Sequence, residues 1–194
     1  MSGDDVRIRT LVRAFADDEF ARWLVPDQQH RHEVYRGWFG MVVPRAEQHG
    51  EVIVGADGLA VQVWLSGRDG PPSILDEEGD RRLAELAGPR MERFREFGEL
   101  TAANHPAEPH QYLAMIAVDP SVQSTGVGGA ELRRALQRWD AEGLPSYLEA
   151  SSARSRNLYL RLGFRDIGTP MVLPHDGPTM YPMWRDAAQV SAPT

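Results

Sequence analysis

The sequence has 194 residues and contains no cysteine. The lack of thiols excludes disulfides, thiol catalysis and thiolate metal sites. No apolar run approaches the roughly 20 residues that span a bilayer. The first five residues, Met-Ser-Gly-Asp-Asp, lack the basic and apolar blocks of a signal peptide. We therefore expect a soluble, cytoplasmic protein with no membrane partner.

Positive charge is also in short supply, because 21 basic residues stand against 28 acidic ones and the net charge is −7. This balance argues against broad nucleic-acid binding and suits a cationic ligand. The histidines show no metal-binding spacing: His30 and His32 lie in a polar helix start, and His105, His110 and His175 stand alone. We expect most of them at the surface, and we predict no metal site.

The chain is long enough to bury a substantial core, and we predict a single domain over residues 1–186 with a disordered tail over 187–194. Apolar spacing predicts a first helix over residues 5–16, started by Ser2, Asp4 or Asp5. The acidic run 17–19 is interpreted as a solvated turn. A second helix follows, which Pro44 bends or ends.

Asp57-Gly58 separates two β-rich runs, 51–55 and 59–64, and predicts a hairpin. Two helices then meet at Gly88-Pro89. Further strands are expected at 147–150, 164–167, 171–173 and 180–184, with a helix over 155–162. Pro182 predicts that the last strand is an edge strand or is broken.

The most informative stretch runs from Gln111 to Phe164. The apolar run Tyr112–Val118 ends at Asp119-Pro120 and predicts a buried strand. A glycine loop follows, Gln123-Ser-Thr-Gly-Val-Gly-Gly129, which opens an amphipathic helix closed by Gly143. No side chain is placed to cap this helix at Gly126, so its first amides are free to bind an anion.

A dinucleotide-binding site is one interpretation of this loop, because an acidic residue, Glu149, follows at about the right distance. However, the third glycine position is occupied by Glu131, which is too large for close helix–strand packing. Too few residues follow Gly163 for a doubly wound sheet. The dinucleotide interpretation is therefore disfavoured.

The pattern Gln-x-x-Gly-x-Gly after Ile-Ala-Val-Asp-Pro, with Leu-Tyr-x-x-x-Gly-Phe about thirty residues later, resembles the GNAT superfamily of N-acetyltransferases. Segments upstream and downstream are similar to puromycin N-acetyltransferase and its relatives. The resemblance implies an α/β (α+β) fold with a mixed, mostly antiparallel sheet that is split at its central strand and covered by helices on both faces. The first strand of that fold is missing here, or Val6–Ile8 is a vestige of it.

The resemblance also implies that acetyl-CoA is the cosubstrate. The matching strand residues would pair with the pantetheine arm and donate an N–H to the thioester oxygen, and the glycine loop would bind the pyrophosphate. The positions so assigned are Ile116, Ala117, Val118, Gln123, Ser124, Thr125, Gly126, Val127, Gly128 and Gly129. The loop has no basic residue where relatives often have one, so amides and the hydroxyls of Ser124 and Thr125 must hold the phosphates. Ser152 stands where the family often has asparagine.

Two side chains match the family's acid and base. Tyr159 would protonate the departing thiolate, since a phenol and a thiolate have comparable basicity; its alternative is a core aromatic. Glu149 would take the proton of the amine, and its alternative is a structural ion pair with Arg154 or Arg165. Trp23 and Trp64 are interpreted as core residues, although either could border the acceptor pocket.

We therefore expect direct acetyl transfer to a primary amine of a small molecule, possible acceptors including antibiotics. The alternatives are a non-catalytic acyl-CoA-binding or regulatory domain, and an O-acetyl or longer-acyl transferase. The acceptor pocket is expected from residues 17–40 and 66–110, and the protein is expected to be a monomer or homodimer.

Overall fold

The computed structural model describes residues 5–188. Three helices come first, α1 (Val6–Phe15), α2 (Glu19–Leu24) and α3 (Gln28–His49). Each begins at an aspartate whose carboxylate accepts a backbone N–H of the first turn, and these caps are Asp5, Asp18 and Asp27. Val6–Ile8 are helical, so the vestigial-strand alternative is wrong, and Ser2 and Asp4 lie outside the described residues.

Helix α3 continues through Pro44, so of the two predicted alternatives, a bend or an end at Pro44, the end is wrong. A proline within a helix removes one N–H donor and crowds the backbone carbonyl four residues earlier, and burial of the apolar side chains of α3 outweighs that local cost. The helix therefore keeps its eight buried residues on one element, and among them are Tyr35, Trp38 and Phe39.

The predicted hairpin is confirmed as β1 (Gly50–Gly55) and β2 (Ala60–Ser66), joined by a 3₁₀ turn over Ala56–Gly58. Ala56, Asp57 and Gly58 all have positive φ, which Asp and Gly tolerate best. The chain then forms α4 (Glu77–Ala87), a 3₁₀ turn (Gly88–Arg90) and α5 (Met91–Asn104). The predicted stop at Gly88 is confirmed.

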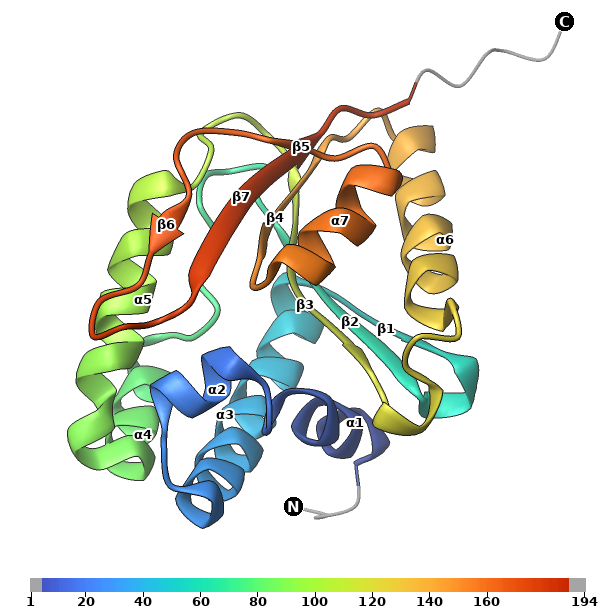
Figure 1. The fold of residues 1–194 in the computed structure, drawn as a ribbon. Coiled ribbons are helices and arrows are strands. Elements are labelled where there is room, and N and C mark those ends of the chain that lie inside the picture. Colours follow the sequence, from blue (N-terminus) through green and yellow to red (C-terminus); the bar gives the residue numbers. More distant parts are fainter. Residues whose placement is uncertain (1–4, 189–194) are drawn as a thin grey trace, which may run out of the picture.

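The second half alternates strands and helices (Figure 1). It contains β3 (Gln111–Val118), a 3₁₀ turn (Pro120–Val122), α6 (Val127–Ala141), β4 (Ser146–Ala150), α7 (Ala153–Arg161), β5 (Arg165–Asp166), β6 (Met171–Val172) and β7 (Thr179–Arg185). Residues 187 and 188 are described, and the Ala188 N–H donates to Asp140. The rest of the predicted disordered tail, from residue 189, lies outside the described residues.

These strands form one sheet in the order β1-β2-β3-β4-β7-β5, with β6 also paired to β7. All pairs are antiparallel except β3–β4. Strand β7 is internal, so the edge-strand prediction for Pro182 is wrong. Pro182 is tolerated because β5 pairs only with residues 183–184 and β6 only with 179–180, so the proline lies where the partner changes.

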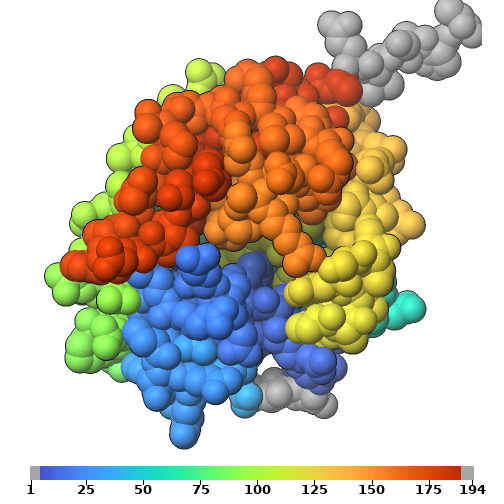
Figure 2. Space-filling view, in the orientation of Figure 1, coloured from blue at the N-terminus to red at the C-terminus, as the bar shows by residue number. Residues whose placement is uncertain are grey.

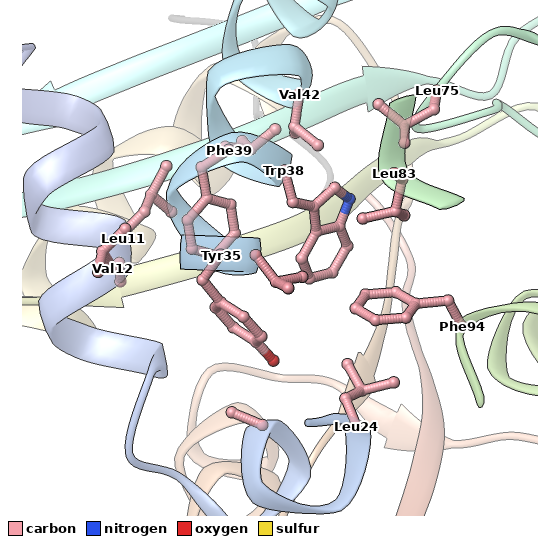
Figure 3. Close-up of a cluster of buried hydrophobic side chains, with 14 of the residues drawn as sticks. Leu11, Val12, Leu24, Tyr35, Trp38, Phe39, Val42, Leu75, Leu83 and Phe94 are labelled. Carbon is pink, nitrogen blue, oxygen red and sulfur yellow. The ribbon is translucent and has the colours of Figure 1, made fainter. Parts of the chain in front are cut away.

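Helices cover both faces of the sheet, as predicted. One core packs α1–α5 against the inward side chains of β2, including Val61, Val63 and Leu65. The other packs α6 and α7 against residues of the opposite parity, including Trp64 and Leu148. Figure 3 shows the first core, where the rings of Trp38 and Phe94 meet edge to face at 5.4 Å.

Candidate active site

The sheet is split between its two parallel strands. Strands β3 and β4 pair only at Gln111–Ser146 and Tyr112–Tyr147 and then diverge (Figure 1). A register shift between Val63 and Trp64 of β2 inserts one extra residue, Ala114, into β3 at the point of divergence. From Leu113 to Val118, β3 therefore has a strand partner on its β2 side alone, and its other side faces the split.

A cavity of about 210 Å³ lies at the split. Its walls come from β3, β4, α7 and the N-terminal helices, and they include Ile116, Glu149 and Tyr159. Three of the predicted site residues are thus brought together in one place. In Figure 2 the surface is hollowed where the blue N-terminal helices, the yellow segment before α6 and the orange segment of α7 meet.

Glu149 lies on β4 with its carboxylate inside this cavity. Its Oε2 accepts a hydrogen bond of 2.8 Å from the Tyr112 hydroxyl, while its buried Oε1 has no partner among the described residues. Burial raises the pKa of Glu149 to about 7, although the hydrogen bond from Tyr112 acts in the opposite direction. A carboxylate with this pKa is half ionised near neutrality and can accept a proton.

The ion-pair alternative for Glu149 is wrong. The Arg154 guanidinium donates to Ser124 Oγ at 2.7 Å, and Arg165 is paired with Asp186 at 3.5 Å. Tyr147, two residues earlier on the same strand, lies beside Glu149 and lowers its pKa in the same sense as Tyr112, although its buried hydroxyl forms no hydrogen bond within the described chain. Nothing on these elements neutralises the Glu149 charge, so burial dominates its titration.

Tyr159 lies on α7 and is 7% exposed. Its ring packs against Phe164 at 5.8 Å, as the core alternative predicts, but the residue also lines the cavity. Burial raises the pKa of the Tyr159 phenol above its usual value of 10, so the hydroxyl stays protonated. No hydrogen bond to this hydroxyl is formed by the described residues, which leaves it available to a ligand.

The glycine loop lies at the N-terminus of α6, as predicted. Gly126 has φ of 91° and provides no side-chain cap, and Ser124 also has positive φ. Within the described chain, the amides of residues 124–129 donate to no backbone carbonyl, whereas the Ala130 amide bonds the Gly126 carbonyl. Free amides at the start of a 15-residue helix form an anion-binding site.

The side chains of the loop are partly committed to its own backbone. Gln123 Nε2 donates to the Val118 carbonyl at 3.0 Å, and Thr125 Oγ1 donates to the Val122 carbonyl at 2.7 Å. Val118 thus ends the splayed strand and anchors the loop, whereas the Ala117 side chain is buried in the core. Gly128 lies so close to Val118 that an added Cβ would meet Val118 Cγ2 at 2.9 Å and displace that side chain.

Arg154 is a candidate residue that the sequence pattern did not reveal. It stands in the first turn of α7, thirty positions after Ser124, and its guanidinium reaches the loop. The basic residue that seemed missing from the loop is therefore supplied from another element. Only the contact between the two elements identifies it, because no spacing in the sequence connects Arg154 with the loop.

Ser152 occupies the cap of α7. Its hydroxyl accepts the Ser155 N–H at 3.1 Å, and the Ser155 hydroxyl accepts the Ser152 N–H at 3.1 Å, which forms a capping box. The serines that line the cavity are its neighbours, Ser151 and Ser155. The structure thus engages the Ser152 side chain in helix capping.

Asp18 and His110 lie in environments that differ from the predicted ones. Asp18, predicted in a solvated turn, caps α2 and lines the cavity, and burial raises its pKa to about 6. Trp23 and Trp64 are core residues as predicted, and the tryptophan that lines the cavity is Trp38. His110 is fully buried, so the surface prediction for this histidine is wrong.

The sheet is thus split, a loop with free amides lies beside the split, and a carboxyl group and a phenol line the opening. The model of the acetyltransferase (GNAT) family matches residues 8–164, and the chain belongs to this family. Acetyl-CoA is accordingly its cosubstrate. Family members act on amine groups of small molecules or peptides.

Solved structures agree with this assignment. The chain is similar to a histone acetyltransferase HPA2 and related acetyltransferase from Corynebacterium glutamicum, with 29% identity, a TM-score of 0.67 and coverage of 96% of this chain and 92% of that chain. The arylalkylamine N-acetyltransferase 2 from Aedes aegypti shares the fold at 14% identity, with a TM-score of 0.60 and coverage of 95% and 94%. No helix among residues 5–188 combines the length and the apolarity required to cross a membrane.

Proposed function

We propose that this protein is an N-acetyltransferase that moves the acetyl group of acetyl-CoA directly to a primary amine of a small molecule. The observation that carries the proposal is that Glu149 and Tyr159 line the same cavity at the split, where Glu149 Oε1 and the Tyr159 hydroxyl have no hydrogen-bond partner among the described residues. A base and an acid on either side of one reaction centre suit direct transfer in a ternary complex.

The reaction begins when Glu149 takes a proton from the bound ammonium or from the attacking amine. The nitrogen lone pair then attacks the thioester carbon and forms the N–C bond of a tetrahedral intermediate. A backbone N–H from Ile116–Val118, on the side of β3 that faces the split, stabilises the oxyanion. The C–S bond breaks, and Tyr159 gives its proton to the CoA thiolate. Solvent then returns a proton to Tyr159 and removes one from Glu149.

Acetyl-CoA binds through its pyrophosphate to the free amides of residues 124–129 and through its pantetheine arm to the splayed β3. Arg154 adds the positive charge that the loop itself lacks. In this proposal the hydroxyls of Ser124 and Thr125 orient the loop, because Thr125 is already bonded to the backbone and Ser124 to Arg154. The similarity to puromycin N-acetyltransferase and the cytoplasmic location are part of this proposal.

The first experiment is thermal unfolding with acetyl-CoA, desulfo-CoA or NADH at equal concentration. We expect a rise of several degrees with the two CoA species alone, because a ligand at 100 times its Kd stabilises the folded state by about 2.7 kcal/mol. A rise with NADH alone would overturn the assignment of the loop.

The second experiment follows release of the CoA thiol with a panel of primary amines. Release that requires an amine, and that leaves the amine acetylated, supports the proposal. Stabilisation by CoA without transfer to any amine would favour a non-catalytic acyl-CoA-binding domain. Preference for alcohols or for longer acyl-CoA would favour the O-acetyl or longer-acyl alternative.

A further inference from the structure

A second and larger cavity adjoins the reaction cavity. It has a volume of about 790 Å³, which lies within the range of sites for drug-sized ligands, about 300–1,000 Å³. The two cavities share four wall residues, namely Trp38, Ile74, Phe97 and Tyr112. The walls of the larger cavity come from α4, α5 and the segment before α4, so it extends away from the glycine loop toward the other half of the molecule.

Asp18 faces the smaller cavity from the turn between α1 and α2. Its Oδ1 accepts the Ala21 N–H at 2.6 Å. Oδ2 has no hydrogen-bond partner within the described chain and is not fully buried. The turn is held in place by the buried Arg31, whose Nε donates to the Ala16 carbonyl and whose Nη2 donates to Asp17 Oδ1 at 3.2 Å. Asp18 is therefore a fixed carboxylate with one free oxygen.

Two carboxylate residues thus line the smaller cavity, Glu149 from β4 and Asp18 from the α1–α2 turn, and each has one oxygen without a hydrogen-bond partner among the described residues. The wall also contains aromatic residues, including Tyr35, Trp38 and Phe97. An ammonium group meets both requirements of such a space, because it pairs with carboxylates and is attracted to aromatic faces.

A directional acceptor lies in the larger cavity. His110 Nδ1 donates to the Glu108 carbonyl at 2.7 Å, so its Nε2 is an acceptor and receives the Nε2–H of His105 at 3.0 Å. Both imidazoles are neutral, because burial lowers their pKa values, that of His105 to about 4. Nδ1 of His105 is therefore an acceptor, and none of the described residues bonds it.

We propose, on the basis of the proposed function, that the acceptor is a bulky, mostly apolar primary amine with one hydrogen-bond donor on its body. Its ammonium group binds between Asp18 and Glu149. Its body extends past Trp38 and Tyr112 into the larger cavity and donates a hydrogen bond to His105 Nδ1. Asp18 acts as the residue that selects a cationic acceptor, and the larger cavity selects for size.

The charge requirement is tested with Asp18→Asn, because asparagine caps a helix as well as aspartate does but carries no charge. We expect KM for tryptamine to rise at least tenfold, with KM for acetyl-CoA unchanged and kcat within about twofold. The matched control is Asp27→Asn, which alters the cap of α3 at a carboxylate outside both cavities. An unchanged amine KM in Asp18→Asn would overturn this role.

The size requirement is tested with Gly98→Leu, since Gly98 lies on α5 in the wall of the larger cavity with open space at its side-chain position. We expect kcat/KM for tryptamine to fall at least tenfold while that for ethylamine is unchanged. Gly40→Leu is the control, because Gly40 is also helical and open but lines neither cavity. Equal effects of Gly98→Leu on both amines would overturn the assignment of the cavity.

The requirement for a hydrogen-bond donor is tested by comparing tryptamine with 2-(1-naphthyl)ethylamine, whose ring lacks the indole N–H. Wild type should prefer tryptamine at least fivefold, and His105→Phe should remove the preference. If wild type transfers acetyl to ethylamine or to a peptide amine as efficiently as to the bulky amines, this inference falls and the proposed function stands. If no amine accepts acetyl while acetyl-CoA still stabilises the protein, both fall.

Discussion

At the residue scale, the burial of Glu149 has two consequences. Its carboxylate is held in a cavity without a cation, so its pKa rises to about 7. This makes it a suitable base, but it also means that folding must bury a charge at neutral pH. The same residue should therefore support activity and reduce stability, which is a common compromise at active sites.

The activity of wild type should rise with pH through about 7, because Glu149 must be ionised to accept a proton. Glu149→Gln should lower kcat/KM by about a hundredfold at pH 7 and should lose this limb of the profile. The deficit should shrink at high pH, where the free amine no longer needs a base. A deficit that is constant from pH 6 to 10 would contradict the role of base.

Stability should change in the opposite sense. The pKa of Glu149 is about 7 in the folded state against an ordinary value of 4.5. Below pH 4.5 the carboxyl is protonated in both states and costs no stability, and the free energy of unfolding declines as pH rises from 4.5 to 7. Glu149→Gln removes this loss, on the order of 1–3 kcal/mol, so the variant should melt above wild type at pH 8 and match it near pH 4. Thermal melts at both values test this, and a variant less stable at pH 8 would contradict it.

Tyr159→Phe tests the acid with little change in packing, because the ring contact with Phe164 remains. We expect kcat to fall by about tenfold or more at saturating substrates. The matched control is Tyr181→Phe, since Tyr181 stacks on Arg156 and lines neither described cavity. Equal turnover of wild type and Tyr159→Phe would remove this hydroxyl from the chemistry.

At the scale of elements, the helix–loop contact between Arg154 and Ser124 places a cation from α7 beside the free amides of α6. Arg154→Gln should raise KM for acetyl-CoA about five- to tenfold, the loss of roughly 1–1.4 kcal/mol, without altering KM for the amine. Added salt should reduce the difference in KM for acetyl-CoA between wild type and Arg154→Gln. Arg156→Gln is the control, because this neighbour is paired with Asp166 instead of the loop.

Local patterns predicted most elements correctly. The hairpin around Asp57-Gly58, the strand before Asp119-Pro120 and the helix closed by Gly143 all follow from signals within a few residues of one another. The two prolines were misjudged for a shared reason. Pro44 is kept within α3 by the burial of that helix's side chains, and Pro182 depends on which strands lie beside β7, so neither outcome is visible in the local pattern.

The candidate site was partly predictable for the same reason. Glu149, Tyr159 and the glycine loop belong to motifs within one stretch, and motif spacing identifies them. Asp18, Trp38 and His105 lie within the ranges 17–40 and 66–110, from which the acceptor pocket is expected, but no local pattern distinguishes them from their neighbours. Arg154 is identified only by its contact with the loop. The sequence therefore predicts individual residues for the proposed acetyl-CoA site and only ranges for the proposed acceptor site.

At the scale of the whole molecule, a partly buried ion pair links the carboxyl-terminal elements. Arg185 of β7 donates through Nη1 and Nη2 to both oxygens of Asp140 on α6, at 2.6 and 2.7 Å, and through Nε to the Leu162 carbonyl after α7. The side chains are 13% and 11% exposed. This pair joins β7 to the two helices that carry the anion-binding loop and Tyr159.

Asp140→Asn should therefore destabilise the protein by about 2–4 kcal/mol, because it leaves a buried guanidinium without its counter-ion. For a chain of this size that loss lowers Tm by roughly 5–12 °C. The pKa of Asp140 is lowered by its bonds from Arg185, so the pair stabilises above the ordinary pKa of 3.8 and the gap to wild type should close as pH falls below about 4.

The matched control is Asp166→Asn, which removes another two-bonded arginine–aspartate pair, to Arg156, with side chains 34% and 40% exposed. Solvent and salt screen such a pair, so its loss should cost less than about 1 kcal/mol. Thermal melts of the two variants at pH 7 separate the effect of burial from that of geometry. Equal losses would mean that burial does not set the strength of these pairs, and that the Asp140–Arg185 pair does not hold the two halves of the site together.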